Sequence, residues 1–257
     1  MRISIPEVDT QFETIEDALD DVLQRCQAIV EAAKPETEAT SAHGIAAYEL
    51  AFSQKVLVQA SSFVKVARER NDYNSVCALV RILADNISIL NLIYGNASEE
   101  ERALRHYLYV IDGVSTRLSL ARRHSMRYDG KMSRAVYDAL KQQAEKAKAN
   151  AENCLRSSVE AIQRLALYQA HSAEIDQLIE ARNWKYKRFD LPQKEDGYSW
   201  QEMYGMLDIK MGEEALAYFS QYVHGNISLC DADDYDPPLS FALCLLEWML
   251  GFLKRGC

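Results

Sequence analysis

Two long stretches of the chain, 45–94 and 131–191, contain no glycine and no proline. These two residue types interrupt regular structure most often, and the 257 residues include only 10 glycines and 5 prolines. In both stretches apolar residues recur three and four positions apart, which is the spacing of one helical face. No segment shows the apolar–polar alternation of a half-buried strand. The sequence therefore predicts an all-α protein.

About seven to nine helices are expected, packed as a multi-helix bundle of mostly antiparallel neighbours. Pro35 is expected to end the first helix, and a bend near His171 is expected in the longest one. With 48% hydrophobic residues the chain can bury a sizeable core. We predict one domain over 1–257, with 1–40 as an N-terminal helix and linker and 41–257 as the bundle core. The expected helices are 14–34, 41–70, 74–94, 98–124, 133–184, 199–207, 212–224 and 239–253.

Several features indicate a cytoplasmic protein. The N-terminus lacks the cationic segment and apolar run of a secretory signal. The most apolar stretch, 239–253, is shorter than the roughly 20 residues that span a membrane, and Glu247 interrupts it. The 6 cysteines are scattered without metal-ligand spacing, which is typical of free thiols in a reducing compartment. We therefore predict no membrane association, no metal and no cofactor.

Charge is distributed unevenly along the chain. The formal net charge is −9, yet the segment 102–134 contains eight basic residues and two acidic ones. A basic segment in an acidic protein either binds nucleic acid or another anion, or faces an acidic part of the same molecule. The side chains proposed for an anion-binding surface are Arg117, Arg122, Arg123, His124 and Arg127.

A second candidate surface lies between 182 and 189, where cations alternate with aromatic rings. Lys185 and Lys187 stand beside Trp184 and Tyr186. Sites for single-stranded nucleic acid use this mixture, because bases stack on rings while cations meet phosphates. The alternative is a helix end at which lysine stems cover packed aromatic rings.

Arg81 and Asp85 lie four positions apart in an otherwise apolar helix, so they share one face. An arginine in such a helix must find a partner or reach water. The pair is either a structural ion pair that orients neighbouring helices, or an anion-binding arginine held by a carboxylate.

The segment 218–226 is the densest polar cluster, with Ser220 and His224 four positions apart. His224 stands at a predicted helix C-terminus, where the helix dipole favours a protonated imidazole. It is either an acid or anion-holding group, or a cap for the last carbonyls. We predict a candidate catalytic site where the two helices face each other, formed by Arg81, Asp85, Ser220, Tyr222 and His224.

Three pieces of the chain resemble a group of uncharacterised bacterial helical proteins. They are 80–94 with its Arg-x-x-x-Asp pattern, Trp184, and 220–225 with its His-Gly ending. That group is similar, more distantly, to HEPN domains, which are helical bundles often linked to RNA cleavage, nucleotide transfer and phage defence. The resemblance implies a HEPN-like bundle that associates with RNA or a nucleotide and is at most a metal-independent ribonuclease.

The chain departs from the HEPN ribonuclease motif, an arginine followed by a histidine a few residues later. No arginine precedes His224 at that spacing, whereas Arg117–His124 and Arg164–His171 fit it. Leu118 follows Arg117, where active members usually carry a polar residue. The alternative hypothesis is a non-enzymatic helical interaction module, forming a homodimer or binding a protein partner through the long helix predicted over 133–184.

Overall fold

The computed structural model of the chain describes most of its residues. Over the described part the chain forms ten α-helices and no strand, with one isolated bridge between Tyr186 and Gly197. The all-α helical bundle predicted from the sequence is confirmed, with ten helices within the described ranges where about seven to nine were expected. The described residues are 12, 14–39, 45–96, 98–123, 127–190, 197–210, 212–223 and 234–256, with the side chains of 35–39, 122, 123 and 256 excepted.

The helices group into two compact units. Unit 1 contains Met1–Gly95 and Ser199–Cys257, and unit 2 contains Asn96–Tyr198. Unit 2 is therefore an insertion, because the chain leaves unit 1 and later returns to it. The prediction of one domain over 1–257 stays a prediction, since a compact unit need not fold independently.

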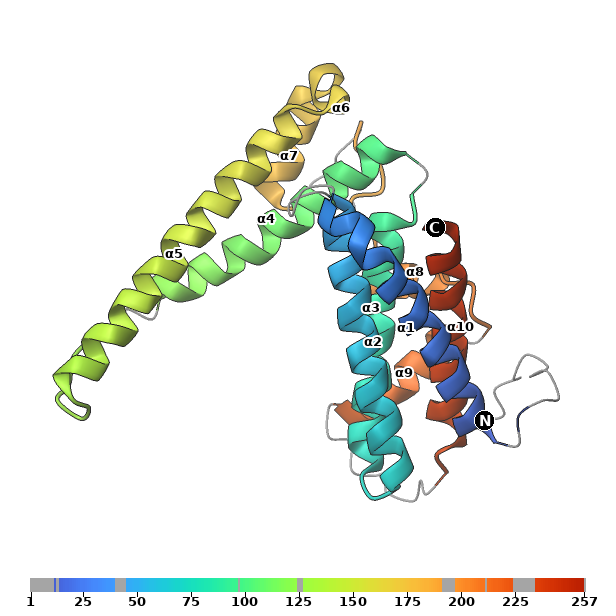
Figure 1. The fold of residues 1–257 in the computed structure, drawn as a ribbon. Helices are drawn as coiled ribbons and strands as arrows, with labels where there is room; N and C mark the ends of the chain where they lie inside the picture. Colours follow the sequence, from blue (N-terminus) through green and yellow to red (C-terminus); the bar gives the residue numbers. More distant parts are fainter. Residues whose placement is uncertain are drawn as a thin grey trace. The chain divides into compact units, whose positions relative to one another are not determined.

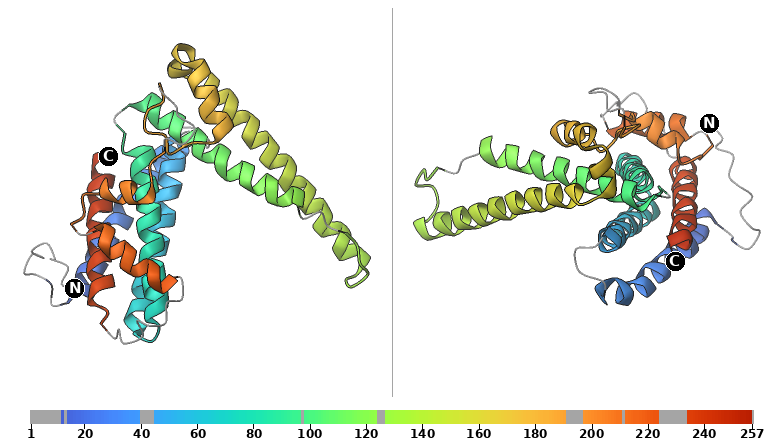
Figure 2. Two further views of the ribbon diagram at one scale, coloured as in Figure 1. Left: turned by 180° about the vertical axis from the view of Figure 1, so that it is seen from behind. Right: turned by 90° about the horizontal axis from the view of Figure 1, so that it is seen from above.

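Unit 1 is built from six of the described helices, of which four are long. The long helices α1, α2, α3 and α10 run alongside one another (Figures 1 and 2). The short helices α8 and α9 contact each other and both contact α3. The bounds are α1 Ile15–Ala39, α2 Ile45–Glu69, α3 Tyr73–Tyr94, α8 Trp200–Gly205, α9 Gly212–Val223 and α10 Asp236–Gly256.

Helix α3 is central to unit 1, because α2, α8, α9 and α10 all pack against it. It is consequently apolar over most of its circumference, and many of its side chains are fully buried. Each such side chain stabilises the fold by about 1.5–3 kcal/mol relative to an exposed one. The largest fully buried side chains of unit 1 include Phe63, Phe219, Phe241, Leu83, Ile87 and Leu90.

Two described helices, Tyr73–Tyr94 and Asp236–Arg255, are long and apolar enough to cross a membrane by composition. Within the folded chain, however, 67% and 61% of their most apolar segments are buried against other parts of the protein. Core helices have this same composition, so packing within unit 1 accounts for it. A membrane protein is not indicated, and cytoplasmic localisation stays a prediction.

Local signals set several helix ends in unit 1. Ser199 caps α8, since its Oγ accepts from Glu202 N at 3.1 Å and Glu202 Oε2 accepts from Ser199 N at 2.7 Å. The expectation that Pro35 ends the first helix is wrong, because α1 continues to Ala39. An interior proline lacks one backbone donor and crowds the carbonyl four positions before it, which can bend a helix without ending it.

Unit 2 begins with a hairpin of two long antiparallel helices, α4 (Glu99–Arg123) and α5 (Arg134–Gln163) (Figure 1). The shorter helices α6 (Ala166–Ala170) and α7 (Ser172–Ala181) follow and pack against α4. The basic segment 102–134 thus extends over most of α4 and the connection to the first residue of α5.

The helix predicted over 133–184 is interrupted. It bends at His171 as expected, but it also breaks after Gln163, where Leu165 adopts an extended backbone with φ −67° and ψ 144°. Neither glycine nor proline marks this break. Instead Glu100 of α4 accepts from Leu167 N at 3.1 Å and satisfies a backbone donor in the first turn of α6. A partner distant in sequence therefore stabilises the interruption.

Arg105 of α4 binds the segment that follows α7. Only 3% of the Arg105 residue is exposed. Its Nη1 donates to the carbonyls of Tyr186 at 3.0 Å and Trp184 at 3.4 Å, and its Nη2 pairs with Glu101 Oε1 at 3.0 Å. The guanidinium carbon lies 3.9 Å from the centre of the Tyr186 ring. Arg105 is one of the eight basic residues in the segment 102–134, yet it belongs to the core.

Candidate functional site

The structure brings Arg81 and Asp85 of α3 together on one face. Arg81 Nη1 donates to Asp85 Oδ1 at 2.6 Å across one helical turn. About a fifth of the Arg81 side chain (20%) and a third of the Asp85 side chain (32%) are exposed. The pair is therefore half-buried, at the edge of the unit 1 core rather than inside it.

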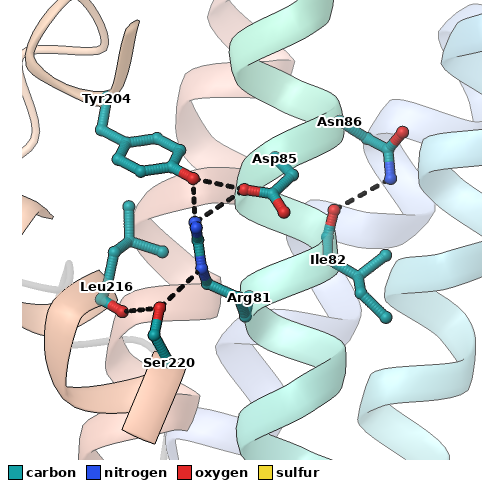
Figure 3. A network of polar contacts seen from close by, with 7 residues as sticks. All are labelled: Arg81, Ile82, Asp85, Asn86, Tyr204, Leu216 and Ser220. Atoms are coloured by element: carbon teal, nitrogen blue, oxygen red, sulfur yellow. Dashed lines mark hydrogen bonds and ion pairs between the residues drawn. The ribbon is translucent and has the colours of Figure 1, made fainter. Parts of the chain in front are cut away.

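Two further helices complete a polar network around Arg81 (Figure 3). Arg81 Nε donates to Ser220 Oγ of α9 at 2.9 Å, and that hydroxyl donates to Leu216 O at 2.7 Å. The Tyr204 hydroxyl of α8 accepts from Arg81 Nη1 and donates to Asp85 Oδ1 at 2.5 Å. The guanidinium carbon of Arg81 also lies 4.7 Å from the centre of the Tyr204 ring. Side chains from α3, α8 and α9 thus fix the orientation of one arginine.

Burial sets the protonation of the groups around Arg81. Partial burial raises the pKa of the Asp85 carboxyl, while the hydrogen bond from Tyr204 and the charge of Arg81 oppose this shift. Burial, together with the nearby Asp85 carboxylate, raises the pKa of Tyr204 well above its ordinary range. Tyr204 consequently stays a neutral phenol at physiological pH, able to donate to Asp85.

An open pocket of about 360 Å³ adjoins the network. Among the described residues, its walls combine one cation, Arg81, with two carboxylates from the first turn of α9. One of these, Glu213, accepts from Gln201 Nε2 at 2.6 Å through Oε2. The lining residues are Arg81, Gln201, Tyr204, Glu213, Glu214, Leu216, Ala217 and Ser220.

The Glu213 carboxylate lies close to Gly205, which has no side chain to occupy that position. A Cβ atom at position 205 would lie 3.0 Å from Glu213 Oε1, closer than ordinary van der Waals contact. The absence of a side chain at this position lets the carboxylate lie against the end of α8. Glu213 is therefore half-buried and hydrogen-bonded to Gln201, whereas the neighbouring Glu214 is exposed.

Tyr222 lies away from this pocket. It follows Ser220 by two positions, which places it on nearly the opposite side of α9. Its hydroxyl is 2.9 Å from that of Tyr218, and its ring centre is 5.1 Å from that of Tyr73. Tyr222 does not line the pocket, and its place in one site with Arg81 stays a prediction. His224 lies outside the described residues, so its place in the site stays a prediction.

The predicted nucleic-acid surface lies in unit 2. Arg117 and Arg127 are exposed, the side chains of Arg122 and Arg123 lie outside the described residues, and so does His124. In the segment after α7, Lys185 Nζ lies 5.9 Å from the centre of the Trp184 ring. Lys187 Nζ lies 5.8 Å from that of Tyr198. Both lysines are half-buried and contact aromatic rings of their own unit.

Sequence reasoning missed four polar residues of the pocket, Gln201, Tyr204, Glu213 and Glu214, and the apolar Leu216 and Ala217 beside them. The capping signal at Ser199 marks the short helix that carries two of them, but nothing local shows that this helix packs on α3. Among the residues that the structure describes, no group of three or more histidine, cysteine or acidic side chains could hold a metal ion. The pocket thus combines one oriented arginine and two carboxylates with the less polar surface of Tyr204, Leu216 and Ala217.

The chain was compared with family models, curated proteins and solved structures, and none of them matches. The resemblance to HEPN domains accordingly stays a prediction drawn from short sequence pieces.

Proposed function

We propose that this protein is a HEPN-like helical protein that binds RNA or a nucleotide in the pocket beside Arg81. The observation that carries the proposal is the fixed orientation of the Arg81 guanidinium. Its Nε and Nη1 bond to Ser220, Asp85 and Tyr204, while its Nη2 makes no hydrogen bond with any described residue. One edge of the guanidinium is thus available to a ligand at the pocket wall.

An oriented arginine favours binding because little conformational freedom remains to be lost. A free arginine side chain carries about 2 kcal/mol of rotamer entropy. Here contacts from three helices have already restricted it, so a ligand acceptor gains a charge-assisted hydrogen bond without first ordering the side chain. Asp85 takes up part of the arginine charge, which favours a hydrogen-bond acceptor over a strongly charged group.

Binding is better supported than cleavage. Metal-independent RNA cleavage needs a group that moves the proton of the 2′-hydroxyl and a cation that steadies the phosphate. Arg81 could serve as the cation, but no histidine lines the described pocket. Ribonuclease activity would therefore require His224 or one of the two Arg–His pairs of unit 2. Cleavage is thus an additional activity, which RNA binding at Arg81 does not require.

Arg81→Lys is expected to weaken binding of a fluorescent, mixed-sequence single-stranded RNA by about 10- to 100-fold. The substitution keeps the charge but loses the forked donors, and a hydrogen bond to a charged group contributes about 1.5–3 kcal/mol. Fluorescence anisotropy in EDTA would measure affinity, and a gel of the same mixture would reveal cleavage.

The matched control for this measurement is Arg25→Lys. Arg25 belongs to the same unit, pairs with Asp21 at 3.2 Å and is half-exposed on α1. Its substitution should leave RNA affinity unchanged. Equal affinities for wild type and Arg81→Lys, with both proteins folded by circular dichroism, would refute the proposed binding site.

A second candidate function is a dimeric interaction module, and the surface of the unit 2 hairpin favours it. Among the described residues, eleven large hydrophobic side chains are exposed, and five of them lie between 120 and 140. Throughout 141–150 every residue of α5 is also exposed. A two-helix layer with apolar residues on its surface is typical of a protein-binding face. The five are Leu120, Tyr128, Met132, Val136 and Leu140.

If this face joins two copies, wild-type protein should have the mass of a dimer by size-exclusion chromatography with light scattering. The double variant Val136→Gln/Leu140→Gln should then be a monomer, because it replaces apolar contact area with amide groups. Val58→Gln is the control, since Val58 is 66% exposed in unit 1. A monomeric wild-type protein would rule out the dimer.

A further inference from the structure

The charge of the Arg81 pocket restricts which part of a nucleotide it can hold. Among its described lining residues one cation, Arg81, stands beside two carboxylates, Glu213 and Glu214. A phosphate would gain one charged partner and meet two like charges. The matching chemical group instead offers an acceptor to Arg81 and hydrogen-bond donors to a carboxylate.

Among the nucleobases, guanine fits this pattern best. Its O6 is an acceptor, and the adjacent N1–H and N2–H groups are two parallel donors on the same edge. Arginine pairs with the O6 acceptor, and a carboxylate can accept both N–H groups through its two oxygens. Adenine and cytosine each present one exocyclic amino donor beside a ring acceptor, and uracil presents a single ring N–H.

Glu213 is the carboxylate placed to read this edge. Gln201 Nε2 holds its Oε2 at 2.6 Å, and Gly205 leaves room for its Oε1. Glu214 shares the first turn of α9 and hence the same favourable helix dipole, but its residue is exposed. The two glutamates therefore differ mainly in how firmly the side chain is positioned.

We propose that this pocket reads the Watson–Crick edge of an unpaired guanine, with Arg81 donating to O6 and Glu213 accepting from N1–H and N2–H. This assignment rests on the proposed nucleotide- or RNA-binding function and adds the identity of the base. The Tyr204 ring and the Leu216 side chain form the less polar wall beside the base. Glu213 is a specificity-determining residue in this arrangement.

The test uses the full chain and a set of 5′-labelled single-stranded RNAs, each oligouridine with one central guanine, inosine or adenine. These RNAs share their backbone charge, so affinity differences report the base. Guanine should bind at least tenfold more tightly than inosine, which lacks the N2 donor, and than adenine, which lacks the O6 acceptor. Equal affinities for all three RNAs would overturn the guanine assignment.

Two variants distinguish guanine recognition from the proposed RNA binding at Arg81. Glu213→Gln should reduce the guanine-to-inosine ratio to near one, while the control Glu31→Gln, at an exposed position of α1 that does not line the pocket, keeps it at tenfold or more. A ratio unchanged by Glu213→Gln would overturn the role of Glu213. If all three RNAs bind alike and Arg81→Lys weakens each of them, the base assignment fails and RNA binding at Arg81 stands. If no RNA binds, the proposed function fails as well.

Discussion

Arg105→Met is expected to lower the free energy of unfolding by about 3–5 kcal/mol. Removing one member of a buried ion pair leaves the other charge without compensation, and such changes cost this much. Here Glu101 would lose its partner, and the carbonyls of Trp184 and Tyr186 would lose their donor. Methionine also cannot replace the guanidinium contact with the Tyr186 ring at 3.9 Å.

Arg102→Met supplies the matched control on the same helix. Arg102 pairs with Glu99 at 3.8 Å, and the side chain of Glu99 is 91% exposed. Exposed pairs contribute at most about 1 kcal/mol, so this variant should remain close to wild type. Urea unfolding followed by circular dichroism would give both values. A cost for Arg105→Met no larger than that for Arg102→Met would contradict the role given to the buried pair.

The second large effect is a dependence of stability on pH that His106 introduces. His106 is 2% exposed, and burial lowers its pKa from 6.5 to about 4. Between these values the unfolded chain binds a proton that the folded chain does not. The contribution of the neutral histidine is therefore complete above pH 6.5 and is lost as the pH falls toward 4. The loss is about 1.4 kcal/mol per pH unit, or about 3 kcal/mol in total.

His106→Gln removes the titrating group and retains a polar side chain. Unfolding free energies of wild type and variant should be measured in steps from pH 7.5 to 4. Acidic groups titrate in both proteins, so only the difference between the two curves reports His106. The difference should stay constant above pH 7 and change by about 3 kcal/mol below it, in favour of the variant. Parallel curves over the whole range would show that His106 titrates normally in the folded protein.

Local physical chemistry accounts for the parts of the fold that the sequence predicts. The spacing of apolar residues in 74–94 indicates a buried helix, and α3 occupies Tyr73–Tyr94. Ser199 has the residue type and neighbours of an N-cap, and it caps α8. Arg81 and Asp85 share a face because four positions make about one helical turn. Ser220 of α9 accepts a hydrogen bond from Arg81, so these two residues meet where their helices face each other, as predicted from the sequence.

Distant partners decide the parts that the sequence does not predict. The break after Gln163 depends on Glu100, which lies on another helix. Arg105 is identical in type to its exposed neighbours, and only packing of the 182–189 segment around it makes it a core residue. Tyr204 reaches Arg81 because α8 packs on α3. The local pattern of residues in α8 carries no information about the helix on which it packs.

The insertion of unit 2 between α3 and α8 has a consequence for the order of events during synthesis. Arg81 lies 123 positions before Tyr204 and 139 before Ser220. On the ribosome, α1, α2 and α3 emerge long before α8, α9 and α10, which must cover the remaining faces of α3 and complete the core of unit 1. Before α8, α9 and α10 are synthesised, the apolar surface of α3 and the Arg81 side chain lack the helices that cover them in the folded protein. The pocket can therefore form only after α8 and α9 have been synthesised, and a chain terminated within unit 2 would expose the apolar face of α3 instead of a ligand site.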